Sequence, residues 1–194
     1  MTNEHEITFL DSLAADTIVV PQVIDNLIND LKRMSYPKDD IDEIILSMDE
    51  AITNAIQETV RKEETTRTAD DNERRKITIR YSIREDNFDA TIIDHGKGLD
   101  LSRLKGFVPN IDSSNYYDQI VKYASESEKN RLTVRVNGKE ITLKGIGVGL
   151  KVILAFMDSV SIDLIDKERV LANSVSEFTD GTILNLNRRR RYTA

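Results

Sequence analysis

Apolar positions alternate with polar ones in several short segments of the chain, and this pattern predicts β-strands. Residues 76–83 and 88–93 alternate with period two on either side of a turn at 85–87, which predicts a β-hairpin. A second hairpin is predicted over 132–143, where Asn-Gly separates two alternating runs. The other predicted strands cover residues 6–10, 160–165 and 182–186.

Apolar residues at helical spacing predict three helices. The first begins at Pro21, which suits a first helical position, and ends at Ser35-Tyr36-Pro37. The second begins near Lys38 and confines its apolar residues to an arc of about 140°. The third follows glycines 145, 147 and 149. Because hairpins and helices alternate along the chain, the order predicts an α+β fold with helices on one face of a sheet.

Three segments stand apart from this pattern. Residues 58–75 contain 11 charged residues in 18 and predict a frayed helix end followed by a solvated loop. Residues 99–144 are of mixed character, and besides the hairpin they predict a short helix with three tyrosines near residues 116–123. The basic run 188–191 is interpreted as a solvated end, with contact to a nucleic acid or a partner as the alternative.

Length and composition narrow the class of protein. With 194 residues the chain is expected to form one domain. The net charge of −7 leaves no excess of cations for general nucleic-acid binding, and the lack of cysteine excludes disulfides and thiol chemistry. Neither a signal peptide nor a membrane-spanning apolar run is evident, so a soluble cytoplasmic protein is expected.

The second predicted helix carries the first candidate site. Glu50 and Asn54 are four residues apart, so their side chains lie one turn apart on the same face. A carboxylate there can accept a proton, and the amide oxygen suits a hard cation such as Mg²⁺. Alone, such a pair is also typical of a solvated helix face.

The second candidate site follows the strand 88–93. Asp94 stands at the end of that strand, and Gly96 and Gly98 come directly after it. The glycines allow a ligand to approach the backbone closely, and a partly buried aspartate can accept a hydrogen bond from a ligand amino group. A glycine-rich turn capped by aspartate explains this block equally well.

The third candidate site is a glycine cluster ahead of the third predicted helix. Gly145, Gly147 and Gly149 lead into the helix, whose first amides favour an anion. The cluster is not a Walker A loop, because no Gly-Lys-Ser/Thr closes it, and it lacks the G-x-G-x-x-G spacing of a dinucleotide site.

Taken in order, these three blocks and the final Gly181-Thr182 resemble the GHKL ATPase superfamily, and most closely the bacterial anti-sigma factor serine kinases. The resemblance implies a Bergerat-type α/β sandwich with a mixed, mostly antiparallel sheet. It extends from Glu6 to Leu186 in a single domain over residues 1–194, with insertions at 58–75 and within a lid at 99–144. One departure is Gln57, which stands near a position where this family often has a histidine.

The resemblance also implies a role for each matching residue. Glu50 would be the general base that acts on the attacking hydroxyl group, Asn54 would bind Mg²⁺, and Asp94 would accept from the adenine amino group. The other ATP-binding residues that it implies are Gly96, Gly98, Gly145, Gly147, Gly149, Leu150 and Thr182.

The activity implied by the resemblance is that of an ATP-dependent serine/threonine kinase. Its substrate would be an anti-anti-sigma protein, and it would also bind a sigma factor and form a homodimer, without contact to nucleic acid or membrane. Two alternatives stay open: a nucleotide-responsive binding module that transfers no phosphate, and a detached catalytic domain of a histidine kinase.

Overall fold

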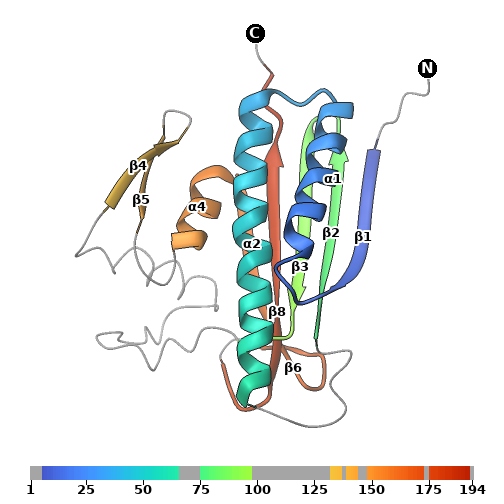
Figure 1. The fold of residues 1–194 in the computed structure, drawn as a ribbon, viewed down its shortest axis with the longest axis vertical. Helices are drawn as coiled ribbons and strands as arrows, with labels where there is room; N and C mark the ends of the chain where they lie inside the picture. The colour runs from blue at the N-terminus through green and yellow to red at the C-terminus, as the bar shows by residue number, and fades with distance from the viewer. Residues whose placement is uncertain are drawn as a thin grey trace.

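The computed structural model describes residues 6–65, 75–97, 132–136, 139–143, 148–172 and 175–192. Two long helices and a broad sheet dominate these segments (Figure 1). In chain order the elements are β1 (Glu6–Ala14), α1 (Val19–Arg33), α2 (Lys38–Thr65), β2 (Lys76–Arg84), β3 (Asn87–Asp94), β4 (Leu132–Val136), β5 (Lys139–Leu143), α4 (Val148–Phe156), β6 (Ser159–Asp166), β7 (Leu171–Ala172) and β8 (Thr179–Arg189).

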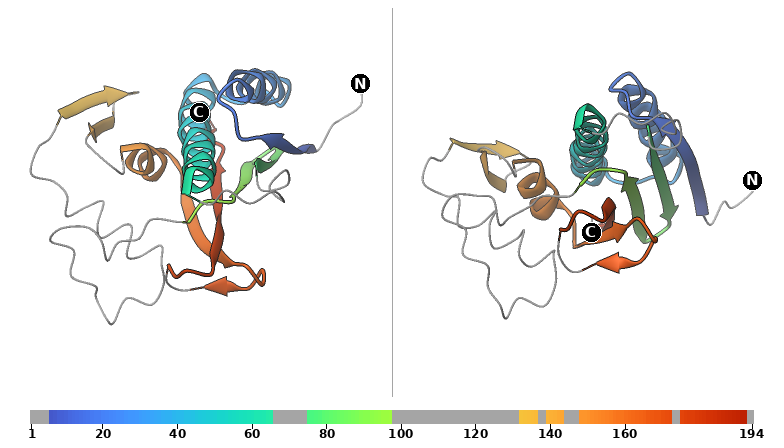
Figure 2. Two further views of the ribbon diagram at one scale, coloured as in Figure 1. Left: turned by 60° about the horizontal axis from the view of Figure 1, so that its bottom comes forward. Right: turned by 90° about the horizontal axis from the view of Figure 1, so that it is seen from below.

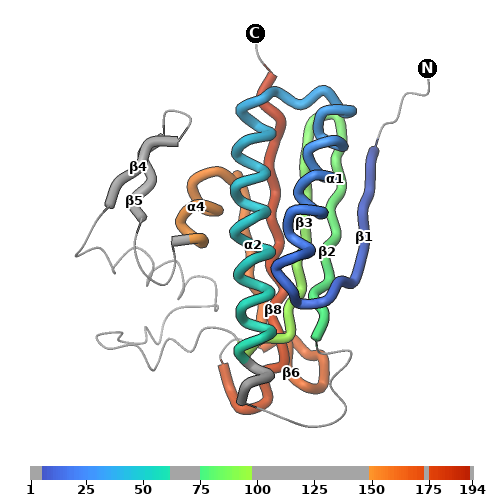
Figure 3. The backbone as a smooth tube through the Cα atoms, viewed as in Figure 1, coloured from blue at the N-terminus to red at the C-terminus, as the bar shows by residue number. Residues whose placement is uncertain are grey.

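The main sheet has six strands in the order β1-β2-β3-β8-β6-β7, and every neighbouring pair is antiparallel. Strand β8 therefore lies between two antiparallel units, β1-β2-β3 and β6-β7. Strands β4 and β5 pair with each other in a separate two-stranded sheet. The predicted α+β sandwich is confirmed, and the smooth tube of Figure 3 shows the chain passing from β1 through both long helices before it forms the β2-β3 hairpin.

Helices α1 and α2 cover one face of the sheet, as the two turned views show (Figure 2). Alternate residues of β2 and β3 point into this layer, so that Ile79, Tyr81 and Phe88 are fully buried. Phe9 of β1 stacks on Tyr81 with 4.9 Å between the ring centroids. Each large side chain buried in this way contributes about 1.5–3 kcal/mol, so this interface is the main source of stability.

The opposite face of the sheet is polar and forms hydrogen bonds across the strands. Asn187 of β8 donates to Asn87 and Asp89 of β3 at 2.9 and 2.8 Å. Thr91 donates to Asn185, which donates in turn to Ser161 of β6. This polar face explains the period-two pattern of the sequence, because only one face of each strand meets the helices.

Helix α2 differs from the prediction at its end. It continues to Thr65, and Thr59 is buried, so the first part of the segment 58–75, predicted as a frayed helix end and a solvated loop, is regular helix, whereas residues 66–74 lie outside the described residues. This part of the helix has no apolar stripe, and it is held by contacts of Glu58 and Thr59 with the residues that follow β3. Helix α1 begins at Val19, two residues before Pro21, which still lies in the first turn where no N–H is needed.

The basic run near the C-terminal end also differs from the prediction. Strand β8 extends to Arg189, and Arg188 is only 5% exposed, so the interpretation of this run as a solvated end is wrong. The Arg188 guanidinium forms ion pairs with Asp40 and Glu43, two buried carboxylates in the first turns of α2.

The hairpin predicted over 132–143 is confirmed as β4 and β5, whereas the helix predicted near residues 116–123 lies outside the described residues. In the part of the chain that the structure describes, no helix is both long enough and apolar enough to cross a membrane.

Candidate functional site

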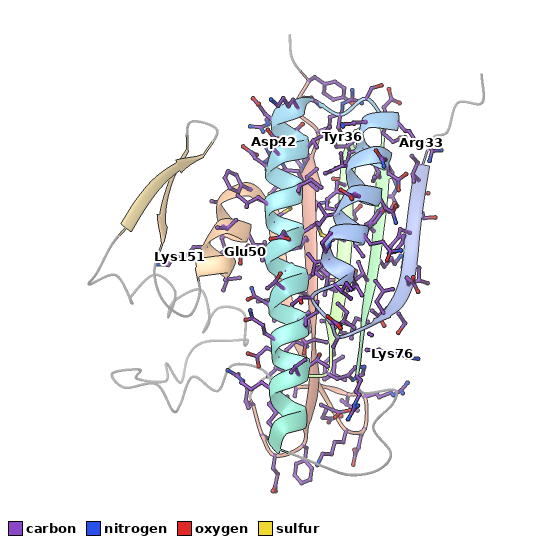
Figure 4. All side chains as sticks on the ribbon, in the orientation of Figure 1. Arg33, Tyr36, Asp42, Glu50, Lys76 and Lys151 are labelled. Atoms are coloured by element: carbon purple, nitrogen blue, oxygen red, sulfur yellow. The ribbon has the colours of Figure 1, made fainter. Side chains whose placement is uncertain are left out.

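One flank of α2 carries three polar side chains at intervals of one helical turn. These are Glu50, Asn54 and Glu58, of which Glu50 and Glu58 are half-buried and Asn54 is exposed. The opposite flank is apolar and packs on the sheet. The three polar side chains therefore point away from this packed flank. Figure 4 places Glu50 on the side of α2 that faces α4.

The first turn of α4 lies directly against this row. Gly149 is buried, and a Cβ atom added there would collide with Glu50 Oε2 and come within 2.8 Å of Asn54 Nδ2. Glycine at this position therefore lets α4 begin against α2 without displacing the ends of these two side chains. Because the first amides of a helix favour an anion, the contact places an anion-binding helix start beside Glu50 and Asn54.

Glu50 has the electrostatic environment of a proton acceptor. Partial burial raises the pKa of its carboxyl group above the usual value, and the neighbouring Asp49 raises it further. Among the described residues no cation pairs with Glu50. A carboxylate whose pKa is raised toward neutrality is a better general base than one that is fully solvated.

A second group of polar residues forms where β3 ends. Asp94 is 6% exposed and faces Thr182 of β8 across the ladder. Its carboxylate accepts a hydrogen bond from the Gly96 N–H at 2.7 Å and another from the Thr182 hydroxyl. Burial raises the pKa of Asp94 to about 6, and the nearby Glu58 carboxylate adds to the rise, while the two hydrogen bonds oppose it.

Helix α2 connects these two groups. The Thr59 hydroxyl oxygen accepts a hydrogen bond from the His95 N–H at 3.2 Å. A Cβ atom on Gly96 would lie 2.7 Å from Glu58 Cβ and 2.9 Å from Asp94 Oδ1, so the backbone at Gly96 packs tightly between them. Asp94 therefore lies beside Glu58, and Glu50 lies eight residues back along the helix, a rise of about 12 Å.

The donor set at the Glu50 end fits a magnesium ion. The Asn54 amide oxygen and the Glu50 carboxylate are hard oxygen ligands of the kind that Mg²⁺ prefers. No group of three His, Cys, Asp or Glu side chains able to hold a metal occurs in the described segments. Because Mg²⁺ is usually bound by one or two protein groups together with phosphate oxygens and waters, this sparse donor set suits a metal that arrives with a phosphate ligand.

The structure brings most of the predicted site residues into these two groups. Glu50, Asn54 and Gly149 meet at one end, and Asp94, Gly96 and Thr182 meet at the other. Leu150 follows Gly149 on α4 and is half-buried, whereas Gly98, Gly145 and Gly147 lie outside the described residues.

Two residues that contact the site were missed by the sequence interpretation. Glu58 and Thr59 fell within the segment that was predicted to fray, yet both contact the end of β3. The available signal was the spacing, because Glu58 continues the four-residue step from Glu50 to Asn54.

Comparison with known protein families agrees with this arrangement. The family model of the histidine kinase-like ATPase domain matches residues 13–172. No match is found among curated proteins. The matched range covers most of the chain and all the described residues of both groups except Thr182. The chain therefore belongs to the histidine kinase-like ATPase domains, which bind ATP, typically with Mg²⁺, and commonly act as kinases or ATPases.

Proposed function

We propose that this chain is an ATP-dependent protein serine/threonine kinase that phosphorylates an anti-anti-sigma protein and also binds a sigma factor. The resemblance of its three sequence blocks to the anti-sigma factor kinases supports this assignment within the family. The presence of Glu50, which can act as a general base, favours phosphate transfer over nucleotide binding alone.

One observation carries the proposal: the proton acceptor Glu50 lies on α2, and Asp94 at the end of β3 lies beside Glu58 of the same helix, eight residues further along. Gly149 packs on Glu50 and Asn54, while Gly96 packs between Glu58 and Asp94. The rise of about 12 Å between Glu50 and Glu58 separates the two groups along the helix, so that one elongated ligand could contact both. A nucleotide whose base contacts Asp94 would thus present its terminal phosphate near Glu50.

In this proposal each residue has a defined chemical task. Asp94 accepts a hydrogen bond from the adenine amino group, and Asn54 holds Mg²⁺, which neutralises phosphate charge when bound. Glu50 takes the proton of the attacking serine or threonine hydroxyl group while the oxygen of that hydroxyl group bonds to the γ-phosphorus. The bond from the γ-phosphorus to the bridging oxygen breaks, and ADP leaves. Positioning and charge neutralisation provide most of the catalysis in reactions of this kind.

The test incubates the full chain with labelled ATP, Mg²⁺ and candidate anti-anti-sigma proteins from the same genome. Transfer of label to a serine or threonine of one candidate is the expected result. A thermal-shift series with ATP and ADP separates binding from transfer, because ligand at about 100 times its Kd stabilises a protein by about 2.7 kcal/mol.

The possible results lead to different conclusions. Stabilisation by both nucleotides without transfer to any candidate would indicate a nucleotide-responsive binding module. A lack of any shift with millimolar nucleotide and Mg²⁺ would overturn the assignment of the site itself.

A further inference from the structure

The last turns of α2 carry an ion pair beside Asp94, and neither of its residues has a role in the proposed phosphate transfer. Arg61 Nη2 lies 2.7 Å from Glu58 Oε2, with the two side chains 62% and 31% exposed, respectively. The stem of Glu58 is fixed by its tight packing on Gly96. The pair therefore holds a guanidinium group at the same end of the site as Asp94, and the backbone of Arg61 lies about 4.5 Å further along the helix axis than that of Glu58.

A bound base gains affinity from stacking on a flat surface as well as from a hydrogen-bond acceptor, and each of the described aromatic residues already contacts another ring, the core or a cation. Phe9, Tyr81 and Phe88 pack together under helices α1 and α2, and Phe156 of α4 is buried in a core cluster with Val152. The remaining three contact cations: Tyr36 and Tyr192 lie against Arg190, and Phe178 lies against Lys167.

We propose that Arg61, held in place by Glu58, is the surface on which the base of the bound nucleotide stacks. The guanidinium group is planar and weakly hydrated, and it stacks well on aromatic rings. Its charge also neutralises Glu58, so that this end of the site gains a flat surface without a further net negative charge near a polyanionic ligand. The inference rests on the proposed nucleotide site and adds to it a residue that determines affinity for the base.

The test compares the wild-type chain with Arg61→Ala, Arg61→Lys and Glu58→Gln. Binding of adenosine, ADP and Mg-ATP is measured by competition against a fluorescent ADP analogue. Arg33→Ala is the matched control, because Arg33 forms the same kind of i,i+3 pair with Asp30 on α1, at 3.3 Å. Arg61 is largely exposed, so its variants are expected to fold normally, and circular dichroism checks this.

If the base stacks on Arg61, Arg61→Ala weakens all three ligands by the same factor, in the range of about 5-fold to 100-fold. Arg61→Lys behaves similarly because an ammonium group keeps the charge but not the plane. Glu58→Gln, which keeps the stem and removes the ion pair, weakens all three by a smaller common factor. Arg33→Ala leaves the three affinities unchanged.

Two results would overturn the inference. Unchanged affinity for adenosine with weaker ADP and ATP would make Arg61 a phosphate contact, and unchanged affinity for all three would make the ion pair a surface feature. Failure of the wild-type chain to bind any of the ligands would instead refute the proposed function.

Discussion

The two halves of α2 both carry acidic side chains next to the sheet, but these side chains have different surroundings. In the first turns, Asp40 and Glu43 are almost completely buried and paired with Arg188 and Arg191. Further along, from the middle of the helix onward, Glu50 and Glu58 are half-buried, and burial raises the pKa of each. The described cations pair with the first set and, through Arg61, with Glu58, but not with Glu50.

The comparison shows how one helix can serve both as a scaffold and as part of a binding site. A buried carboxylate that is neutralised within the protein fixes the helix in place and has no capacity left for a ligand. Burial destabilises the charged form of a carboxylate that has no protein cation beside it. Binding a cation or taking up a proton removes this unfavourable electrostatic energy. The four predictions that follow test this division, from the largest expected effect to the smallest.

Replacing Glu50 by glutamine tests the functional half most directly. The change keeps the shape and removes the proton acceptor, so phosphate transfer is expected to fall by about 10²–10⁴-fold while ATP affinity stays within a few-fold. Single-turnover transfer assays and equilibrium binding measure the two effects separately. Normal turnover by this variant would mean that Glu50 is only part of a solvated helix surface.

Replacing Arg188 by alanine tests the scaffold half. Asp40 and Glu43 would lose their ion pairs with Arg188 and keep those with Arg191, and removing one partner of a buried ion pair typically costs about 3–5 kcal/mol. Urea denaturation should show a loss toward the lower end of this range, with nucleotide affinity of the folded protein little changed. Arg189→Ala is the matched control, because Arg189 is the next residue and its side chain is exposed. Substitutions of exposed side chains usually change the free energy of unfolding by no more than about 0.5 kcal/mol. An equal, small loss for both variants would contradict the scaffold role.

A methyl group at position 149 sharpens the boundary between the two halves. In Gly149→Ala the added carbon displaces the ends of the Glu50 and Asn54 side chains, which are flexible, rather than backbone. Stability is therefore expected to change by less than about 1 kcal/mol, while transfer falls by about 10-fold or more. In a double-mutant cycle, Glu50→Gln should cost less in the Gly149→Ala background than in the wild type, and strictly additive effects would contradict the contact.

The smallest effect is a pH dependence that comes from Asp94. Because burial raises its folded-state pKa to about 6, above the unfolded value, the folded protein takes up the proton first as the pH falls. Its contribution to stability therefore improves by about 1 kcal/mol between about pH 7.5 and pH 5.

The matched variant for this effect is Asp94→Asn, which should lack that contribution when denaturation is measured across the same pH range. With ATP present the trend should reverse, because the adenine amino group favours the ionised carboxylate and affinity falls below about pH 6. A pH profile identical in the two proteins would show that Asp94 does not titrate in this range.

Much of the fold could be predicted from local pattern. The hairpin of β2 and β3 and the amphipathic half of α2 depend on spacing alone, and both match the structure closely. The chain beyond Gln57 could not be predicted in the same way, because Glu58 and Thr59 are held by the end of β3 and not by an apolar stripe. Arg188 was misjudged for the same reason, since its buried partners are 145 and 148 residues away in sequence.

The candidate site was predictable where chemistry and spacing coincide. Glu50 and Asn54 share a helix face whatever the tertiary fold, and Asp94 is marked by its position after an apolar strand. What no local pattern gives is that Gly149 packs on Glu50, or that Thr182 donates to Asp94 across the ladder. Those contacts depend on the order of strands in the sheet.

The central position of β8 also has a consequence for the synthesis of the protein. Because translation produces β8 after every other described strand, β1-β2-β3 and β6-β7 emerge from the ribosome without the strand that joins them. Thr182 then meets Asp94 across 88 residues of chain, and Arg191 meets Asp40 across 151. Contacts of such long range form slowly. The nascent chain therefore exposes unpaired edges of β3 and β6 until β8 inserts between them, and during that interval it depends most on protection from aggregation.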